Sequence, residues 1–256
     1  MPKINLIDTH AHFNTLLMPN LEEQLQLAKK NEDVSKIINV GLNPKTSQDA
    51  LNISLKYSNF YATLGVHPLY DGQIETLEKI YTTYNHKKIV AIGETGIDTQ
   101  GDIKVQIKNF IKSIELANQL KLPVIIHAHT TKNASIYASR LCLEIMKKHK
   151  PHYGFVFHYF QPDLEILPEI NNLEGYISVG ANITKPNAKK SLEVVKTMPL
   201  EKLLIETDYP FLTKEPNNTG KETFQKICEL TNMPKKVLMK TLNQNATTLF
   251  QNLKNK

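Results

Sequence analysis

The chain has 256 residues, of which 41% are hydrophobic and 22% are charged, and this composition is ordinary for a globular protein. No apolar run approaches the ~18 residues of a transmembrane helix, so we expect no membrane span. The net charge of +6 comes from 31 Lys and Arg against 25 Asp and Glu, and it favours polyanionic partners without identifying one.

The two cysteines, Cys142 and Cys228, lie far apart and match no metal-binding or redox pattern. We expect free thiols packed as small hydrophobic side chains, which suits a reducing compartment. The N-terminus shows no basic stretch followed by an apolar segment, so we expect no signal peptide and a cytoplasmic protein.

Short β-branched runs alternate with longer helical patterns along the whole chain. The strand candidates are residues 4–9, 36–41, 60–65, 88–93, 123–127, 154–158, 175–179 and 202–207. Apolar residues recur at helical spacing in the stretches 21–28, 103–117 and 136–145, and helical patterns at 221–231 and 234–252 complete the outer layer. This alternation predicts an α/β fold, the (β/α)8 TIM barrel, with residues 1–256 forming a single domain.

The most informative stretch is Asp8-Thr9-His10-Ala11-His12, which closes the first predicted strand. Side chains at i and i+2 of a strand share a face, so His10 and His12 would point the same way. Two imidazoles held in this manner can share one cation. The alternative is a pair of unrelated polar residues in a turn.

Other predicted strands also end in reactive side chains, and a barrel keeps its active site at that end of its strands. These residues are His67, Glu94, His127, His158, Glu206 and Asp208. Any one of them could be a hydrogen-bonded residue at a strand end, but the set favours a metal site, because clustered buried carboxylates and imidazoles need a cation.

The number of candidate ligands exceeds one four-coordinate site. Four imidazoles (His10, His12, His127 and His158) and two carboxylates (Glu94 and Asp208) suit two adjacent metal ions with a bridging carboxylate. Two ions about 3.5–4 Å apart serve phosphoester hydrolysis well, because they activate water and neutralise charge on the phosphate.

At this point the chain resembles the TatD-type metal-dependent deoxyribonucleases, a branch of the metal-dependent hydrolase barrels. The matching segments occur in family order and extend from about residue 4 to Asn245. They are Leu6–Asn14, Gly65–Pro68, Gly93–Asp98, Leu122–His127, the surroundings of His158, Tyr176–Gly180 and Leu203–Leu212. The ordered set is more specific than any single motif.

The resemblance implies roles for particular residues. It assigns one metal to His10, His12, Glu94 and Asp208, and a second metal to Glu94, His127 and His158, with Glu94 as the bridge. It also implies that Asp208 takes a proton from the attacking water, and that His67 meets substrate rather than metal. Family members are typically cytoplasmic, use magnesium or manganese, and trim DNA or RNA from the 3′ end, although some hydrolyse D-aminoacyl-tRNA.

Several positions depart from the family pattern. His129 replaces a common arginine, a natural phosphate contact, and could act partly in its place, orient a neighbour or lie exposed in a loop. Thr99 replaces a common aromatic residue, and the loop after Leu212 lacks the usual arginines. These changes concern the substrate rather than the metals.

Glu206, two residues before Asp208, could orient a ligand histidine or a water, or cap a loop.

Two further expectations concern smaller signals near the predicted site. Asp98 is expected to close the turn at Gly96. The aromatic residues Tyr159, Phe160 and Tyr209 lie beside predicted ligands and could stack on a base or pack in the core.

We therefore predict a monomeric divalent-metal phosphodiesterase, a 3′–5′ exonuclease acting on single-stranded DNA and on RNA. The main alternative is a D-aminoacyl-tRNA deacylase or other amidohydrolase-like C=O hydrolase on the same barrel, and a second is a non-catalytic nucleic-acid-binding barrel. A histidine-rich ligand set favours zinc on ligand chemistry, whereas the resemblance implies magnesium or manganese.

Overall fold

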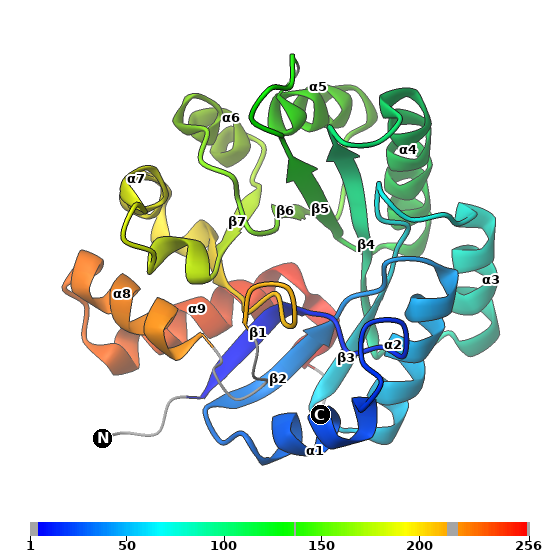
Figure 1. The fold of residues 1–256 in the computed structure, drawn as a ribbon, viewed down its shortest axis with the longest axis horizontal. Helices are drawn as coiled ribbons and strands as arrows, with labels where there is room; N and C mark the ends of the chain where they lie inside the picture. The colour runs from blue at the N-terminus through cyan, green and yellow to red at the C-terminus, as the bar shows by residue number, and fades with distance from the viewer. Residues whose placement is uncertain (1–4, 136, 214–219, 255–256) are drawn as a thin grey trace.

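The computed structural model describes residues 5–135, 137–213 and 220–254. Strands occupy the centre and helices surround them (Figure 1), and strands and helices alternate along the chain as far as β8, which two helices follow. The strands are β1 (Leu6–Ala11), β2 (Val34–Asn39), β3 (Phe60–Leu64), β4 (Ile89–Asp98), β5 (Val124–His129), β6 (Phe155–Phe157), β7 (Tyr176–Val179) and β8 (Leu203–Ile205). The helices are α1 (Leu21–Lys30), α2 (Pro44–Lys56), α3 (Ile74–Tyr84), α4 (Ile103–Leu120), α5 (Ala138–His149), α6 (Leu167–Asn172), α7 (Lys189–Thr197), α8 (Lys221–Thr231) and α9 (Lys235–Leu249).

All eight strands pair in parallel with their sequence neighbours, in the order β1 to β8. The circle closes just after β8, where Ala11 of β1 and Tyr209 form an isolated parallel bridge. This is the predicted (β/α)8 barrel, and the fold class is confirmed.

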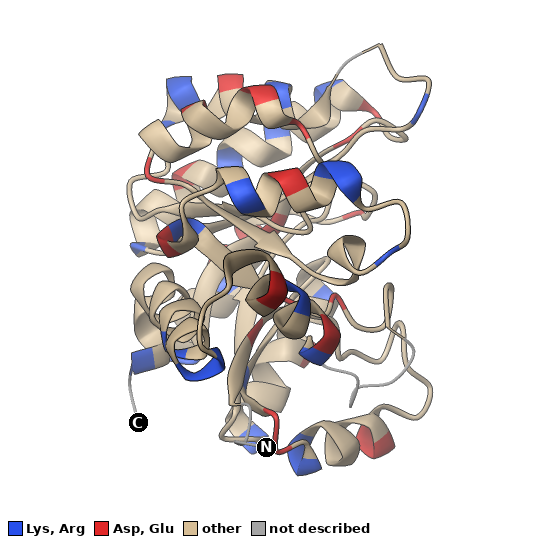
Figure 2. Ribbon diagram, turned by 90° about the vertical axis from the view of Figure 1, so that its left-hand side faces the viewer, with Lys and Arg blue, Asp and Glu red and all other residues tan. Residues whose placement is uncertain are grey.

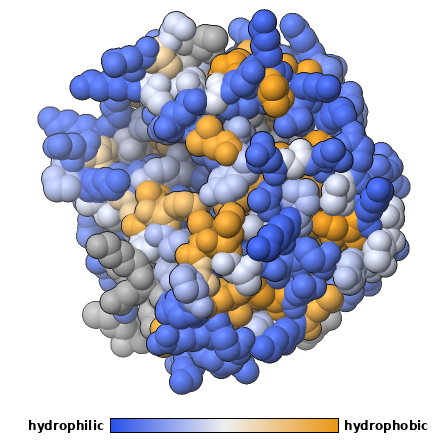
Figure 3. All heavy atoms as spheres, turned by 45° about the vertical axis from the view of Figure 1, so that its right-hand side comes forward, coloured by the Kyte–Doolittle hydropathy of each residue, from blue (hydrophilic) through white to orange (hydrophobic). Residues whose placement is uncertain are grey.

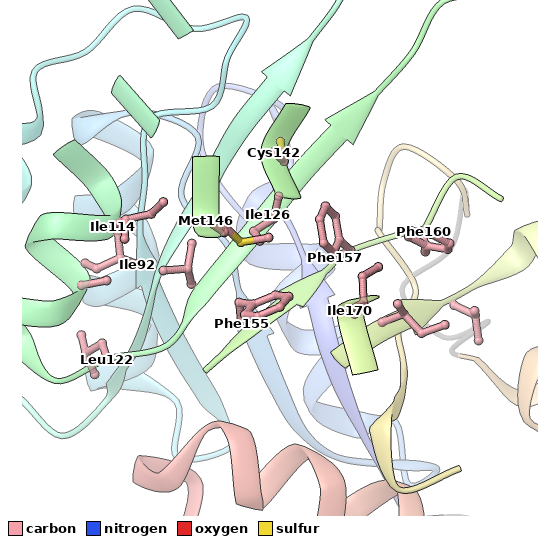
Figure 4. Packing of buried hydrophobic residues seen from close by; sticks show 14 of the residues in the cluster. Ile92, Ile114, Leu122, Ile126, Cys142, Met146, Phe155, Phe157, Phe160 and Ile170 are labelled. Atoms are coloured by element: carbon pink, nitrogen blue, oxygen red, sulfur yellow. The ribbon is translucent and has the colours of Figure 1, made fainter. Parts of the chain in front are cut away.

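Side chains of the strands face two different cores, in the alternation that the period of a strand requires, except in β4, where the register with β3 shifts. One core lies inside the barrel and takes an apolar side chain from every strand, namely Ile7, Ile38, Tyr61, Val90, Ile125, Val156, Tyr176 and Leu204. The other lies between the strands and the helices. There Ile92, Ile126 and Phe155 of the sheet meet Ile114 of α4 and Met146 of α5 (Figure 4).

Helix starts follow from local sequence. Asn43 caps α2, since its side chain accepts from the backbone N–H of Thr46, and Pro44 follows where no N–H is needed. Asp102 caps α4 by accepting from the backbone N–H groups of Lys104 and Val105. Both helices therefore begin immediately beyond the barrel rim that carries the site.

The end of the chain does more than complete the outer layer. Leu249 at the end of α9, Phe250 immediately after it, and Leu253 in the 3-10 helix η4 (Gln251–Lys254) belong to the core inside the barrel. The end of α9 and η4 therefore close the amino-terminal mouth of the barrel, and the predicted helix over 234–252 stops at Leu249 for this reason.

Most predicted boundaries lie within a few residues of the observed ones, but β4 is longer than expected. It runs to Asp98, so Glu94 lies inside the strand rather than after it. Helix α5 begins at Ala138, while Ile136, the first residue of the predicted helical pattern, lies outside the described residues. The same holds for most of the loop after Leu212.

Charged residues lie mainly on the surrounding helices and loops (Figure 2). On another face, exposed hydrophobic patches are separated by hydrophilic side chains (Figure 3). Among the described helices, none is both long enough and apolar enough to cross a membrane.

Candidate active site

The predicted site residues meet at the carboxyl ends of the strands. Close backbone packing brings β4 into position, because a Cβ at Gly65 would lie 2.3 Å from the carbonyl carbon of Gly93. The register then places Gly96 of β4 beside His127 of β5. Because residue 65 is glycine, the part of the β4 backbone that carries Glu94 can pack closely against it and lie towards the barrel axis.

The closure of the barrel brings Asp208 to the two histidines of β1. The Asp208 N–H donates to the His10 carbonyl (2.8 Å), and the His12 N–H donates to the Tyr209 carbonyl (2.7 Å). Buried Asp8 reinforces this seam, since its carboxylate accepts from the N–H (3.0 Å) and hydroxyl (2.7 Å) of Thr207. Burial raises the pKa of Asp8 to about 7.

A first group of ligand atoms gathers around the Nε2 atoms of His10 and His12, which lie 3.0 Å apart. Glu94 Oε2 lies 3.4 Å and 3.6 Å from these two nitrogens, and Asp208 Oδ1 lies 3.9 Å and 3.3 Å from them. All four side chains are buried. Such a set of converging nitrogen and oxygen atoms is what a divalent cation requires.

A second group gathers around the other oxygen of Glu94. Its Oε1 lies 2.7 Å from His127 Nδ1 and 2.7 Å from His158 Nε2. One buried carboxylate therefore faces two sets of histidines with its two oxygens.

Hydrogen bonds on the far side of the rings fix the tautomers of two histidines. His12 Nδ1 donates to the carbonyl of Val40 (3.0 Å), so its Nε2 lone pair faces the site. His127 Nε2 lies 3.0 Å from Asp98 Oδ2 and donates to it, so its Nδ1 faces Glu94 Oε1 at 2.7 Å, and the two carboxylates raise the pKa of His127 against the effect of burial.

His67 lies among the same groups, but its protonation differs. Its Nε2 is 3.2 Å from His127 Nδ1 and 3.7 Å from Glu94 Oε1, within reach of the second group. However, its Nδ1 accepts from the backbone N–H of Leu69 (3.0 Å), and burial together with the neighbouring histidines lowers its pKa to about 3. The neutral ring therefore carries its proton on Nε2, and it offers a donor rather than a lone pair to the site.

Charge inside the cluster is balanced between carboxylates and imidazoles. Burial would raise the pKa of Glu94, but His158, His67 and His10 hold it well below its usual value. Burial would lower the pKa of His158, but Glu94 and Glu206 hold it well above. Without a cation, a proton on His158 Nε2 compensates Glu94, and a bound cation would replace that proton.

The residues present fit divalent cations. The cluster opens into a cavity of about 250 Å³ that contains Glu94, Asp98 and Asp208 but, within the described residues, no Lys or Arg. Buried Asp208 Oδ1 has no hydrogen-bond partner among the described residues, although His12 Nε2 lies 3.3 Å away. With no basic side chain in the cavity, a bound cation would neutralise the converging carboxylates when the histidines are neutral.

Two further candidates lie beside the ligand groups. Glu206 Oε1 is 3.5 Å from His158 Nδ1 and accepts from the backbone N–H of Tyr159 (2.6 Å), and its Oε2 accepts from the hydroxyl of Ser178 (2.5 Å). Glu206 therefore faces a predicted ligand histidine and also caps the loop that follows β6. His129 Nδ1 is 3.3 Å from Asp98 Oδ2, and its side chain is 45% exposed. His129 is therefore a partly exposed neighbour of the carboxylate that orients His127.

Some sequence expectations need correction. Asp98 contacts His127 besides accepting from the backbone N–H of Gln100, because β4 continues to this residue and turns its side chain to the site. Phe160 and Tyr209 are buried in hydrophobic clusters and have little surface for a base. The exposed aromatic ring at the cavity is instead Phe211, which is 53% exposed and which sequence reasoning missed.

The comparisons with known proteins agree with this geometry. The family model described as TatD related DNase matches residues 7–251. The chain belongs to this family. It is 35% identical to the uncharacterized metal-dependent hydrolase YabD of Bacillus subtilis, covering 96% of this chain and 99% of that protein. It is 30% identical to the uncharacterized metal-dependent hydrolase YjjV of Escherichia coli, covering 95% and 97%.

Solved structures agree as well. The crystal structure of YjjV, a TatD homologue from E. coli, superposes with a TM-score of 0.83 at 29% identity over 96% of this chain and 98% of that one. A TatD-family hydrolase of Entamoeba histolytica shares the fold, with a TM-score of 0.79 at 21% identity over 97% and 98%. This TatD-family chain is thus a metal-dependent hydrolase, and its His, Glu and Asp clusters are candidate metal sites.

Proposed function

We propose that this TatD-family hydrolase is a 3′–5′ exonuclease that uses two divalent ions to cleave phosphodiester bonds of single-stranded DNA, and also of RNA. The observation that carries the proposal is the buried Glu94 carboxylate. Its Oε2 faces His10 and His12, and its Oε1 faces His127 and His158. A carboxylate shared between two ligand groups supports a pair of adjacent ions.

In this proposal the chain's own side chains have distinct tasks. When bound, the ions would supply Lewis-acid activation of water and would neutralise the phosphate charge. Asp208, held by its neighbours in the ionised form, would accept the proton of the attacking water. His67 would donate a hydrogen bond from its Nε2–H to a phosphate oxygen, a task that suits a buried neutral imidazole.

The shape of the site supports attack at the end of a strand. A cavity of about 250 Å³ is small, and a terminal nucleotide would need less of the rim to be open than a continuous strand would. No basic side chain lines it among the described residues, so phosphate recognition would depend on the cations and His67.

We further infer that magnesium or manganese supports the reaction, with zinc the alternative that a histidine-rich donor set would also accept. The two cysteines are free thiols, and one of them, Cys142, is buried. This pattern supports our proposal of an enzyme in the reducing cytoplasm, and we propose that the enzyme is monomeric.

An assay panel tests the reaction class. Purified enzyme is incubated with Mg²⁺ or Mn²⁺ and with end-labelled single-stranded DNA, end-labelled RNA, or D-aminoacyl-tRNA. We expect release of nucleotides from the 3′ end of the DNA. Glu94→Ala and His127→Ala should each abolish this release while circular dichroism stays unchanged, whereas the exposed Glu144→Ala should retain it.

Two results would contradict the nuclease proposal. One is cleavage of D-aminoacyl-tRNA with the labelled DNA and RNA left intact, which would favour the deacylase alternative. The other is binding of DNA without any cleavage under either metal, which would favour a binding module.

A further inference from the structure

A second cavity, of about 660 Å³, lies at the opposite end of the barrel from the active site. Its walls come from the start of β2, the residues before β3 and β4, and η4. Its volume is in the range of roughly 300–1,000 Å³ that small-molecule sites occupy. The active-site function does not account for it, because Glu94 and the histidines lie at the carboxyl ends of the strands.

Two ammonium groups approach one aromatic ring in this cavity. Lys88 Nζ lies 4.1 Å, and Lys36 Nζ 5.4 Å, from the ring centroid of the buried Tyr61. Lys88 Nζ donates to the carbonyls of Ser58 (2.5 Å) and Phe60 (2.9 Å), and Lys36 Nζ donates to a carbonyl of η4. An ammonium has three N–H groups, so each lysine retains at least one donor.

The positive charge in the cavity is not matched by acidic side chains. No Asp or Glu lines it, and within the described part of the chain Lys36, Lys87 and Lys88 form no ion pair. Elsewhere on the surface, by contrast, Lys56 pairs with Glu22. Burial and the nearby Lys36 lower the pKa of Lys88, as expected for like charges held close together.

A histidine adds a further donor. His86 Nδ1 accepts from the backbone N–H of Lys88 (3.1 Å), so the neutral ring carries its proton on Nε2. The lining thus combines hydrogen-bond donors and positive charge with apolar surface that the Tyr61 ring and the aliphatic stems of the lysines supply. This is the opposite of the active-site cavity, in which carboxylates converge.

We propose that this amino-end cavity binds a free phosphate ester of nucleotide size, with the phosphate held by Lys36, Lys88 and His86 and the organic part in the apolar remainder. Hydrogen bonds from charged donors to a phosphate are strong and match the pattern of free N–H groups. The site stands apart from the proposed nuclease function, and its occupancy does not require the metal cluster.

The test measures binding of AMP, and of inorganic phosphate, to the full chain by isothermal titration calorimetry. Glu94→Ala is the background, so that the metal cluster contributes no competing site. We expect one AMP to bind. Adding Lys36→Met and Lys88→Met should weaken this binding about tenfold or more, whereas the exposed pair Lys148→Met and Lys190→Met, with the same change in net charge, should not.

A second variant distinguishes loss of the binding site from misfolding, because Lys88 also donates hydrogen bonds to two backbone carbonyls. Ser58→Trp fills the cavity from an exposed position without removing a charge, and it should block AMP binding with the melting temperature unchanged. Unchanged AMP binding in both Ser58→Trp and the double lysine variant would overturn the proposal. So would binding of a single-stranded oligonucleotide at these lysines with no binding of AMP, which would indicate a strand-binding surface.

Discussion

At the scale of single residues, hydrogen bonds outside the ligand groups decide what each histidine can do. Val40 and Asp98 accept hydrogen bonds from His12 and His127, and the other ring nitrogen of each histidine therefore faces the site. His67 instead accepts from the backbone N–H of Leu69, which leaves its Nε2–H towards the site. These bonds support the proposed division of the histidines between metal binding and hydrogen-bond donation.

Asp98 is expected to affect metal affinity and turnover because it holds the ring of His127 in place. Asp98→Asn weakens the acceptor that holds the His127 ring, and loss of such a partner typically costs about 10–100-fold in metal affinity or activity. Mn²⁺ affinity by titration calorimetry, together with turnover, measures the effect. His129→Ala, which removes the partly exposed contact to the same carboxylate oxygen, is the matched control and should change both much less. Equal effects of the two variants would argue against the orienting role.

Phe211 is expected to hold the substrate base. Its ring is 53% exposed at the cavity and packs edge-on against His12, with centroids 5.2 Å apart. Stacking on a base contributes about 1–3 kcal/mol, so Phe211→Ala should raise KM for single-stranded DNA about 5- to 100-fold with metal affinity unchanged. Phe211→Trp should retain a low KM, and the exposed Leu55→Ala should have no effect. A KM unchanged in Phe211→Ala would exclude stacking at this residue.

At the scale of elements, helix α9 connects the two ends of the barrel circle. The side-chain NH2 of Asn245 donates to the carbonyls of Leu200 (2.7 Å) and Leu203 (2.8 Å), at the start of β8. The side chain of Asn243 bonds the backbone of Asn5 and Ile7 at the start of β1. The helix thus holds β1 and β8 together at the end opposite the site, where they form no extended ladder.

Asn245→Ala should lower the stability of the fold without changing the turnover of the folded enzyme. It leaves two carbonyls without their donor, at a cost of about 1–3 kcal/mol, which corresponds to a fall in Tm of about 2–10 °C in a protein of this size. Scanning calorimetry measures the fall, and turnover per folded molecule should stay at the wild-type level. The exposed Gln244→Ala serves as the control. A Tm equal to that of wild type would show that these bonds contribute nothing net.

At the scale of the whole molecule, the site joins parts of the chain that are almost two hundred residues apart. The candidate ligands come from the ends of β1, β4, β5, β6 and β8, so a cation held among them would link strands around most of the barrel. A ligand that binds only the folded state stabilises that state by mass action.

Metal removal should therefore lower the melting temperature. With free Mn²⁺ at 100 times its dissociation constant, the stabilisation is about 2.7 kcal/mol, or about 5–10 °C in Tm. Chelation by EDTA should remove this increment from the wild type. Glu94→Ala, which lacks the shared carboxylate, should melt at nearly the same temperature with and without Mn²⁺. A wild-type Tm insensitive to EDTA would count against a metal-linked barrel.

The sequence by itself determined the barrel and the composition of the site, because strand period, helix period and the residues at strand ends are local properties. His10, His12, Glu94, His127, His158 and Asp208 could all be selected in this way. Tertiary structure alone decided the rest. Asp98 turns to His127, Asp8 joins the seam after β8, and Phe211 reaches the cavity. The basic cavity also depends on how the amino ends of β2 to β4 meet the end of the chain. These contacts join residues that are distant in sequence, and no local pattern of hydrophobicity or charge encodes them.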